Sequence, residues 1–221
     1  MNILVVCAHP DDEIFGIGGT IAKHTSKGDK VYTLILGEGK TSRGATEKQE
    51  LDELKKESLE ANKVLGVKEV FFEDLPDNKF DSVPLLDIIK KVESYIEKID
   101  PEIVYTHYGD DLNIDHKLIF QAVLTAARPL PGSRIKLLAV FETLSSTEWA
   151  EDEKTFVPNF YSEISNNLDK KLDAMSKYKS ELREFPHPRS LEGIKILAKK
   201  RGVEAGVKAV EALKIIREIE G

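Results

Sequence analysis

The 221-residue chain contains a single cysteine, Cys7, so no disulfide can form within it. It also lacks an uninterrupted apolar run of about 18 residues, which is the length that a membrane-spanning helix needs. Met1 leads directly into a short apolar run, without the basic and then apolar leader of a secreted protein. These absences predict a cytoplasmic protein with no membrane span, in a compartment where thiols stay reduced.

Positive charge is also scarce. The 32 Lys and Arg residues are outnumbered by 39 Asp and Glu residues, which gives a net charge of −7, and no basic face is evident. A chain of this charge repels polyanions, so nucleic acid is excluded as a general partner. With 41% hydrophobic residues and no repeat or linker, residues 1–221 are expected to form one domain around one core.

Apolar runs that suit buried strands alternate with segments that repeat apolar residues at helical spacing. The expected strands cover residues 3–7, 30–36, 69–72, 103–105 and 136–141, and the clearest helices between them cover 47–65 and 85–99. This order predicts right-handed parallel crossovers, and hence a Rossmann-like three-layer α/β/α sandwich with a mainly parallel sheet. Beyond residue 142 we expect one further strand over 156–164, and helices over 168–178, 190–200 and 204–219.

The densest chemistry follows the first expected strand, in the sequence Cys-Ala-His-Pro-Asp-Asp-Glu of residues 7–13. Ligands of open α/β sheets bind outside the carboxyl ends of the strands, where this turn would lie. One imidazole and three carboxylates crowded there would repel one another unless a cation held them. A catalytic zinc takes three protein ligands. His9 and Asp12 could supply two, and the best candidate for the third is His116, which follows the strand expected at 103–105.

These residues resemble a known family. Residues 8–13, Ala-His-Pro-Asp-Asp-Glu, match the signature of the LmbE-like/PIG-L zinc-dependent de-N-acetylases, and residues 113–116 lie where that family has its second motif. Further similarities are the glycines at 16, 18 and 19, Leu-Pro-Asp at 75–77 and Pro-His-Pro-Arg-Ser at 186–190. The resemblance implies that His9, Asp12 and His116 bind Zn²⁺, or another divalent transition metal, and that Asp11 is the general base.

The second motif leaves two roles open. Many relatives have His where this chain has Asn113, and an amide cannot donate a proton as an imidazolium does. Asn113 is therefore a candidate to hydrogen-bond the substrate, at the oxyanion or at a sugar hydroxyl, or it simply caps the helix expected from about residue 114. Asp115 is a candidate to orient a neighbouring histidine, or it is an ordinary acid in the first turn of that helix.

The leaving amine then needs another proton donor. The candidates are Asp11 in its protonated form, His187 and His107, and His187 is favoured because some relatives use a late histidine near the active site. Each histidine also has a purely structural alternative, and His107 is a candidate substrate contact as well. Arg43 is a candidate to pair with a phosphate or carboxylate of the substrate, or it is a mobile surface residue. By resemblance, a homo-oligomer is expected, in which a neighbouring subunit could supply the late histidine.

The resemblance implies a zinc-dependent hydrolase that removes the N-acetyl group from an N-acetylglucosamine-type sugar or sugar conjugate. Its partner would be a small N-acetylated amino sugar. Two alternatives are an amidase for thiol-sugar conjugates and a non-catalytic sugar- or nucleotide-binding module. In that module the glycines of residues 16–19 would approach a phosphate, but the acids at 11–13 lie in between and would repel it.

Overall fold

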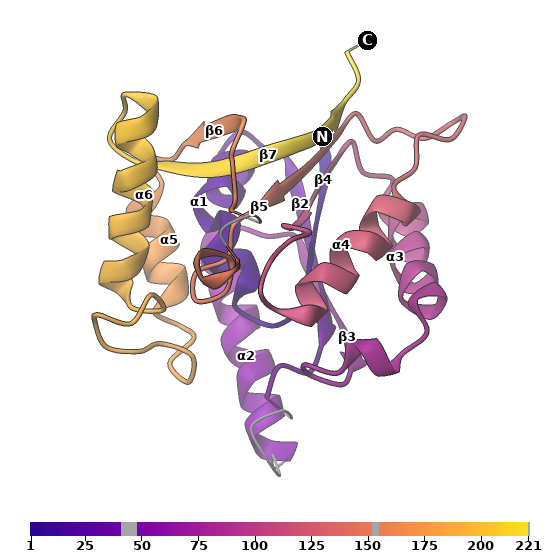
Figure 1. The fold of residues 1–221 in the computed structure, drawn as a ribbon, viewed down its shortest axis with the longest axis horizontal. Helices are drawn as coiled ribbons and strands as arrows, with labels where there is room; N and C mark the ends of the chain where they lie inside the picture. The colour runs from indigo at the N-terminus through magenta and orange to yellow at the C-terminus, as the bar shows by residue number, and fades with distance from the viewer. Residues whose placement is uncertain (41–47, 152–154, 221) are drawn as a thin grey trace.

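The computed structural model describes residues 1–40, 48–151 and 155–220. At the centre of this described part is a seven-stranded sheet with the order β3-β2-β1-β4-β5-β7-β6 (Figure 1). Its strands are β1 (Asn2–Cys7), β2 (Lys30–Gly37), β3 (Glu69–Leu75), β4 (Ile103–His107), β5 (Leu137–Phe141), β6 (Phe160–Glu163) and β7 (Val210–Glu218). Strands β1 to β5 pair in parallel, whereas β7 runs antiparallel to both β5 and β6.

Helices cover both faces of the sheet (Figure 1). One face carries α3 (Leu85–Ile99) and α4 (Ile114–Ala126), and the other carries α1 (Asp12–Ser26), α2 (Lys48–Leu65), α5 (Leu168–Met175) and α6 (Leu191–Ala205). The arrangement confirms the predicted Rossmann-like three-layer sandwich. Among the described helices, none combines the length and the apolar character required to cross a bilayer.

The core lies on both sides of the sheet, which explains why its central strands are continuous apolar runs. In β1, Ile3, Val5 and Cys7 pack toward α1 and α2. The alternate residues Leu4 and Val6 pack toward α3 and α4. A strand that is buried on both faces needs apolar residues at every position.

The strand order places a crevice between two particular strands. β1 pairs with β2 on one side and β4 on the other, so the order reverses at this pair. In open α/β sheets such a reversal opens a crevice at the carboxyl ends of the strands, because the following helices leave toward opposite faces. The segments after Cys7 and His107 are therefore brought to one place.

The expectation of a helix over residues 204–219 is wrong. Helix α6 ends at Ala205, and Gly206 follows with a φ of 73°, a left-handed conformation that commonly terminates helices. The chain then forms β7, which lies between β5 and β6 and is buried over its first four residues. Pairing on both sides and burial override the helical spacing of the apolar residues.

The glycines of residues 16–19 lie inside α1, not in a phosphate-binding loop. The helix is interrupted at Ile17, where φ is −134° and ψ is 25°. A Cβ atom on Gly16 would lie 2.3 Å from the ring of Phe141, and one on Gly19 would lie 2.8 Å from Ile164. These glycines therefore allow α1 to pack closely on neighbouring elements, and the structure lends no support to a phosphate cradle there.

Candidate active site

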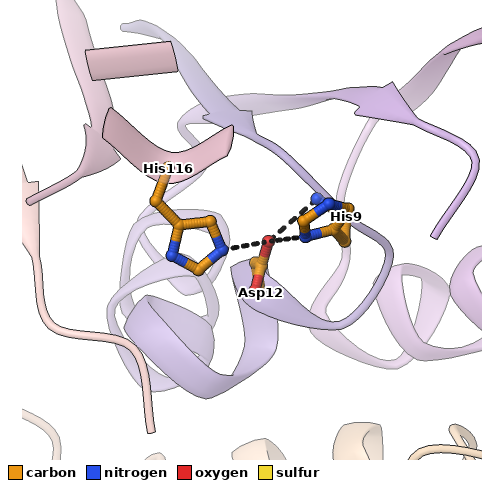
Figure 2. Close-up of side chains that lie close together, drawn as sticks. All are labelled: His9, Asp12 and His116. Carbon is orange, nitrogen blue, oxygen red and sulfur yellow. Dashed lines mark hydrogen bonds and ion pairs between the residues drawn. The ribbon is translucent and has the colours of Figure 1, made fainter. Parts of the chain in front are cut away.

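Three side chains from two distant segments meet at the carboxyl ends of β1 and β4 (Figure 2). His9 precedes α1, Asp12 begins α1, and His116 lies in the first turn of α4. Asp12 Oδ2 is 3.6 Å from His9 Nδ1 and 3.4 Å from His116 Nε2. All three residues are at most 9% exposed, and one possible ligand atom from each lies within 4.8 Å of the others. The structure thus brings together the three residues predicted to bind the metal.

His9 is oriented by two carboxylates on its far side. Its Nε2 atom lies 2.9 Å from Asp115 Oδ2 and 3.1 Å from Asp77 Oδ1. Asp115 is fully buried and also accepts hydrogen bonds from the backbone N–H groups of Asn78 and Phe80. Because Nε2 is engaged in this way, Nδ1 is the nitrogen that faces Asp12. Asp115 therefore lies where it can orient a histidine, as one of its two predicted roles requires.

His116 has a corresponding carboxylate. Its Nδ1 atom lies 3.1 Å from Asp111 Oδ1, although the angle there is poor for a hydrogen bond. Asp111 accepts hydrogen bonds from the hydroxyls of Ser146 and Thr147 and from the backbone N–H of Asn113. Burial raises the pKa of Asp111, but His116 and these hydroxyls lower it to about 2. The Asp111 carboxylate is therefore ionised. Because it faces Nδ1 of His116, the other ring nitrogen, Nε2, points toward Asp12.

The charges of the three candidate ligands depend on one another. Burial lowers the pKa of His9, but hydrogen bonds to the surrounding carboxylates outweigh it and raise this pKa well above its usual value. Burial also lowers the pKa of His116, and Asp12 and Asp111 raise it to about 9. Burial raises the pKa of Asp12, yet the charge of His116 holds it well below its usual value. Without a cation, protonated imidazoles balance the buried carboxylates.

The donor set fits a divalent transition metal. Two imidazole nitrogens and one carboxylate oxygen match a three-residue catalytic zinc site, in which a fourth position stays open. A cation bound there would replace the imidazolium protons as the balance for Asp12. His9, Asp77 and Asp115 also lie close enough to form a group, but His9 Nε2 already contacts both carboxylates. That second group is better explained as the support of His9.

His107 lies beneath the site and not at its surface. The residue is fully buried, its ring stacks on that of His116 with centroids 3.8 Å apart, and its Nε2 accepts a hydrogen bond from the backbone N–H of Ala8. Burial lowers its pKa to about 4, so the ring is neutral. The structure does not place His107 where it could contact a substrate, and its position favours the structural alternative.

Asp11 adopts a left-handed backbone conformation, with a φ of 103°. Such a conformation costs about 1–3 kcal/mol outside glycine and persists only when neighbours enforce it. Here the Asp11 N–H donates to Glu13 Oε2 at 3.0 Å, and Glu13 Oε1 accepts from Asn62 and Tyr178. Burial raises the pKa of Glu13 to about 7. This network holds the Asp11 side chain apart from Asp12, toward the cavity.

An arginine from the C-terminal region contacts Asp11. The Arg189 guanidinium pairs with Asp11 Oδ2, lies 3.3 Å from Glu181 Oε2 and stacks over the ring of Phe15 at 5.1 Å. Burial lowers the pKa of Arg189 to about 10, which still leaves it charged at neutral pH. Asp11 and Arg189 thus form a carboxylate–guanidinium pair beside the candidate metal ligands.

These groups open onto a small polar cavity of about 110 Å³. Among the described residues, its lining contains the three candidate ligands, the predicted base and residues from four further loops. These lining residues are His9, Pro10, Asp11, Asp12, Phe15, Gly39, Asp77, Asn78, Asn113, His116, Thr143, Leu144, Ser145, Ser146, Glu181 and Arg189. The candidate metal ligands and the predicted base thus line one shared space.

The remaining predicted residues lie at different distances from this cavity. Asn113 lines it, and it also caps α4 by accepting from the N–H of Asp115 while its amide donates to Asn78. His187 does not line it: its ring contacts that of Trp149 at 6.2 Å, and its Nδ1 accepts from the Arg189 N–H. Arg43 lies outside the described residues.

Four residues of the site were not predicted from the sequence. Asp77, Asp111, Glu181 and Arg189 each reach it through a contact between distant segments. Asp77 and Arg189 lie within segments that resemble the family, so this resemblance was the available signal. Asp111 had only its place near the second motif, and Glu181 had no signal because its contact depends on the packing of the C-terminal region.

The support of His9 gives a first prediction. Asp115→Asn is expected to lower zinc affinity by about 10- to 100-fold, because one amide group cannot accept from His9 and both backbone N–H groups as the carboxylate does. Competition with a chromogenic chelator measures this affinity. Asp87→Asn is the matched control, since Asp87 is an exposed acid in the first turn of α3. Equal affinities in the two variants would show that Asp115 does not orient a ligand.

Fold and site together define a class of protein. It is an α/β domain with a candidate metal triad and a neighbouring carboxylate at the topological switch point. The family described as PIG-L, GlcNAc-PI de-N-acetylase, matches residues 4–127, which is more than half of the chain. The chain therefore belongs to this family. The match contains all three candidate metal ligands and ends before the segment that carries Arg189.

Curated relatives with deacetylase names extend over most of the chain. A probable N-acetyl-alpha-D-glucosaminyl L-malate deacetylase 2 from Bacillus cereus is 25% identical over 187 residues, covering 81% of this chain and 83% of that protein. The diacetylchitobiose deacetylase of Thermococcus kodakarensis is 29% identical over 195 residues, covering 83% of this chain and 71% of that protein. The named relatives thus include deacetylases for two kinds of N-acetylglucosamine compound.

Solved structures share the fold. The N,N'-diacetylchitobiose deacetylase of Pyrococcus horikoshii superimposes with a TM-score of 0.79 at 20% identity, covering 98% of this chain and 84% of that one. The 4-carboxy-2-hydroxymuconate hydratase of Pseudomonas putida gives a TM-score of 0.77 at 24% identity, covering 100% and 98%. Because one of these enzymes is a hydratase, the fold alone does not decide the reaction.

Proposed function

We propose that this protein is a zinc-dependent N-deacetylase that hydrolyses the acetamide of an N-acetylglucosamine-type sugar or sugar conjugate. The observation that carries the proposal is the buried set of His9, Asp12 and His116 with Asp11 on the same small cavity. Membership of a de-N-acetylase family and the names of the curated relatives support the choice of an amide as the bond that breaks.

In the proposed mechanism His9, Asp12 and His116 hold the metal. A zinc ion bound there would act as a Lewis acid, which lowers the pKa of water and polarises an amide carbonyl. Asp11 lies on the same cavity, has no role as a ligand and is aligned by Glu13 and Arg189. As a carboxylate it takes the proton that attacking water must lose. Arg189 pairs with this carboxylate and holds it on the cavity beside the candidate metal ligands.

Asp11 is also the group that we assign to protonate the leaving amine. The proton that it takes from water can be returned to nitrogen as the tetrahedral carbon collapses, so one carboxylate serves as base and then as acid. His187 was favoured for this role by the resemblance, but it lies outside the cavity lining, and Asn113 has no acidic proton. The amide of Asn113 is assigned to hydrogen-bond the substrate.

The size and polarity of the cavity suit an acetamido group attached to a sugar. A volume of about 110 Å³ admits a small acyl group such as acetyl. An amidase for thiol-sugar conjugates would differ only in the groups that flank the amide, so it remains the alternative within this reaction class. A homo-oligomer and a cytoplasmic location also remain predictions.

The proposal is tested by amine release. Zinc-loaded protein is incubated with a panel of N-acetylated sugars, glycosides and thiol-sugar conjugates, and new amines are detected with fluorescamine. We expect release from at least one N-acetylglucosamine compound and its loss with a chelator. Absorbance of unsaturated carboxylic acids is followed in parallel. Hydration of such an acid without any amine release would replace the deacetylase with the hydratase chemistry that one structural relative carries.

Zinc binding should depend strongly on pH. His116 has a pKa of about 9 and that of His9 is also raised, so zinc must displace protons at neutral pH. With a pKa of about 9, His116 holds the proton that competes with zinc below about pH 9 and loses it above that pH. Zinc affinity is therefore expected to rise with pH between 6 and 8, by about tenfold per unit for each displaced proton. Chelator competition at three pH values measures the slope, and a flat profile would contradict the assigned ligands.

A further inference from the structure

The single tryptophan of the chain lies exposed beside the cavity. Trp149 is 53% exposed and ends the short helix Thr147–Trp149, directly after the cavity-lining residues Ser145 and Ser146. Its ring meets that of His187 edge to face, with centroids 6.2 Å apart and an interplanar angle of 81°. His187 in turn accepts from the N–H of Arg189, which also lines the cavity. The pair therefore joins two of the loops that form the cavity rim.

The cavity is too small to enclose a whole substrate. Pockets that bury a small-molecule ligand usually measure about 300–1,000 Å³, and this one measures about 110 Å³. A sugar with its acetamido group inside must leave the rest of the molecule at the rim. An exposed indole ring is well suited to cover the apolar face of a second pyranose, because it offers a large flat surface at little cost in conformational entropy.

His187 adds a polar group to the same surface. Its Nδ1 atom accepts a hydrogen bond from the Arg189 N–H at 3.0 Å, so in the neutral ring the proton lies on Nε2. This leaves an N–H donor next to the Trp149 ring. An aromatic face with an adjacent donor matches a pyranose, which has apolar C–H groups on its faces and hydroxyls around its edge.

The charges nearby favour a neutral group at this position. Glu148 precedes Trp149, and its carboxylate accepts from the N–H groups of Ser145 and Ser146. Arg189, the arginine among the described lining residues, is already paired with Asp11 and Glu181. A dicarboxylic group such as malate would face Glu148 without a free arginine among these residues. A second neutral sugar meets no such repulsion.

We infer that Trp149 and His187 form a subsite for a second, neutral pyranose ring, so that the preferred substrate is an N-acetylated amino-sugar disaccharide. The inference rests on the proposed function for the reaction, but the subsite itself can be detected without turnover. It assigns Trp149 to the sugar next to the one that loses its acetyl group. Stacking of this kind is expected to improve binding about three- to tenfold.

Because Trp149 is the single tryptophan, its fluorescence reports on this subsite directly. Zinc-loaded Asp11→Asn protein, chosen to prevent turnover, is titrated with N,N'-diacetylchitobiose, N-acetylglucosamine and N-acetylglucosaminyl malate. The disaccharide should change the emission of Trp149 and bind about three- to tenfold more tightly than the monosaccharide. Tighter binding of the malate conjugate than of the disaccharide would overturn the inference, as would an emission unaffected by saturating disaccharide.

A second experiment measures kinetics with protein that retains Asp11 and the candidate metal ligands. Trp149→Ala should raise the KM for the disaccharide about three- to tenfold and leave the KM for the monosaccharide unchanged, and Trp149→Phe should recover most of the difference. Tyr161→Ala, at an exposed aromatic on β6, is the matched control and should change neither. Equal effects of Trp149→Ala on both sugars would overturn the subsite while deacetylation stands. If the disaccharide bound in the fluorescence titration but the intact protein released no amine from any sugar, the subsite would stand and the proposed deacetylase activity would be refuted.

Discussion

Asp11→Asn protein is expected to bind zinc as the unaltered protein does and to lose turnover by a factor of about 10² to 10⁴. The substitution keeps the size of the side chain and a hydrogen-bond acceptor for Arg189, but an amide cannot take a proton from water. The three candidate ligands are untouched. Zinc content by elemental analysis and the rate of amine release measure the two effects separately.

Asp110→Asn is the control for this variant. Asp110 is an exposed carboxylate just before the second motif, outside the cavity lining, so its loss should leave the rate within about twofold. An Asp11→Asn protein with full activity would show that another group is the base. A variant that also lost its zinc would contradict the expectation that Asp11 is not needed for the metal site.

His116→Ala protein is expected to lose both metal and activity. Loss of a residue that only orients a ligand lowers metal affinity by at most about 100-fold. Removing one of the three candidate ligands should lower zinc affinity by more than that. Activity should fall to that of chelator-treated protein. Chelator competition and amine release are the measurements, and circular dichroism checks that the chain is folded. His116→Gln, which keeps most of the side-chain volume, should behave in the same way.

His24→Ala separates this effect from the general loss of a histidine. His24 lies in the last turn of α1, where it contacts Asp29 and Tyr105, far along the helix from Asp12. This variant should bind one zinc per chain with unchanged affinity. If a folded His116→Ala protein bound zinc as tightly as the His24→Ala protein, His116 would not be a ligand.

The meeting of the three candidate ligands was predictable because it follows from strand order. Residues 7–13 and 113–116 each follow an apolar run, and adjacent parallel strands end at the same edge of a sheet. The pairing of Arg189 with Asp11 was not predictable in this way. It joins residues 178 positions apart through α5, α6 and the loop between them, and no periodic pattern reports such packing.

The C-terminal strand shows the limit of periodicity more sharply. Val210 and Leu213 have a spacing that also suits one face of a helix, and Lys and Glu residues around them favour helices. Their conformation is decided by pairing with β5, because residues Leu137–Phe141 of that strand pair with β7. A partner strand some 70 residues earlier in the chain is not visible in a local window. The same holds for Asp77, whose contact with His9 depends on the path of the chain after β3.

Reconstitution with metal tests the central claim most directly. Zn²⁺ is added stepwise to metal-free protein while amine release from an N-acetylated amino sugar is measured. Deacetylation at a site formed by His9, Asp12 and His116 predicts a rate that rises linearly, levels off at about one zinc per chain and returns to background with a chelator. A metal-free protein as active as the zinc-loaded one would contradict the claim, and so would a fully loaded protein that releases no amine from any N-acetylated sugar.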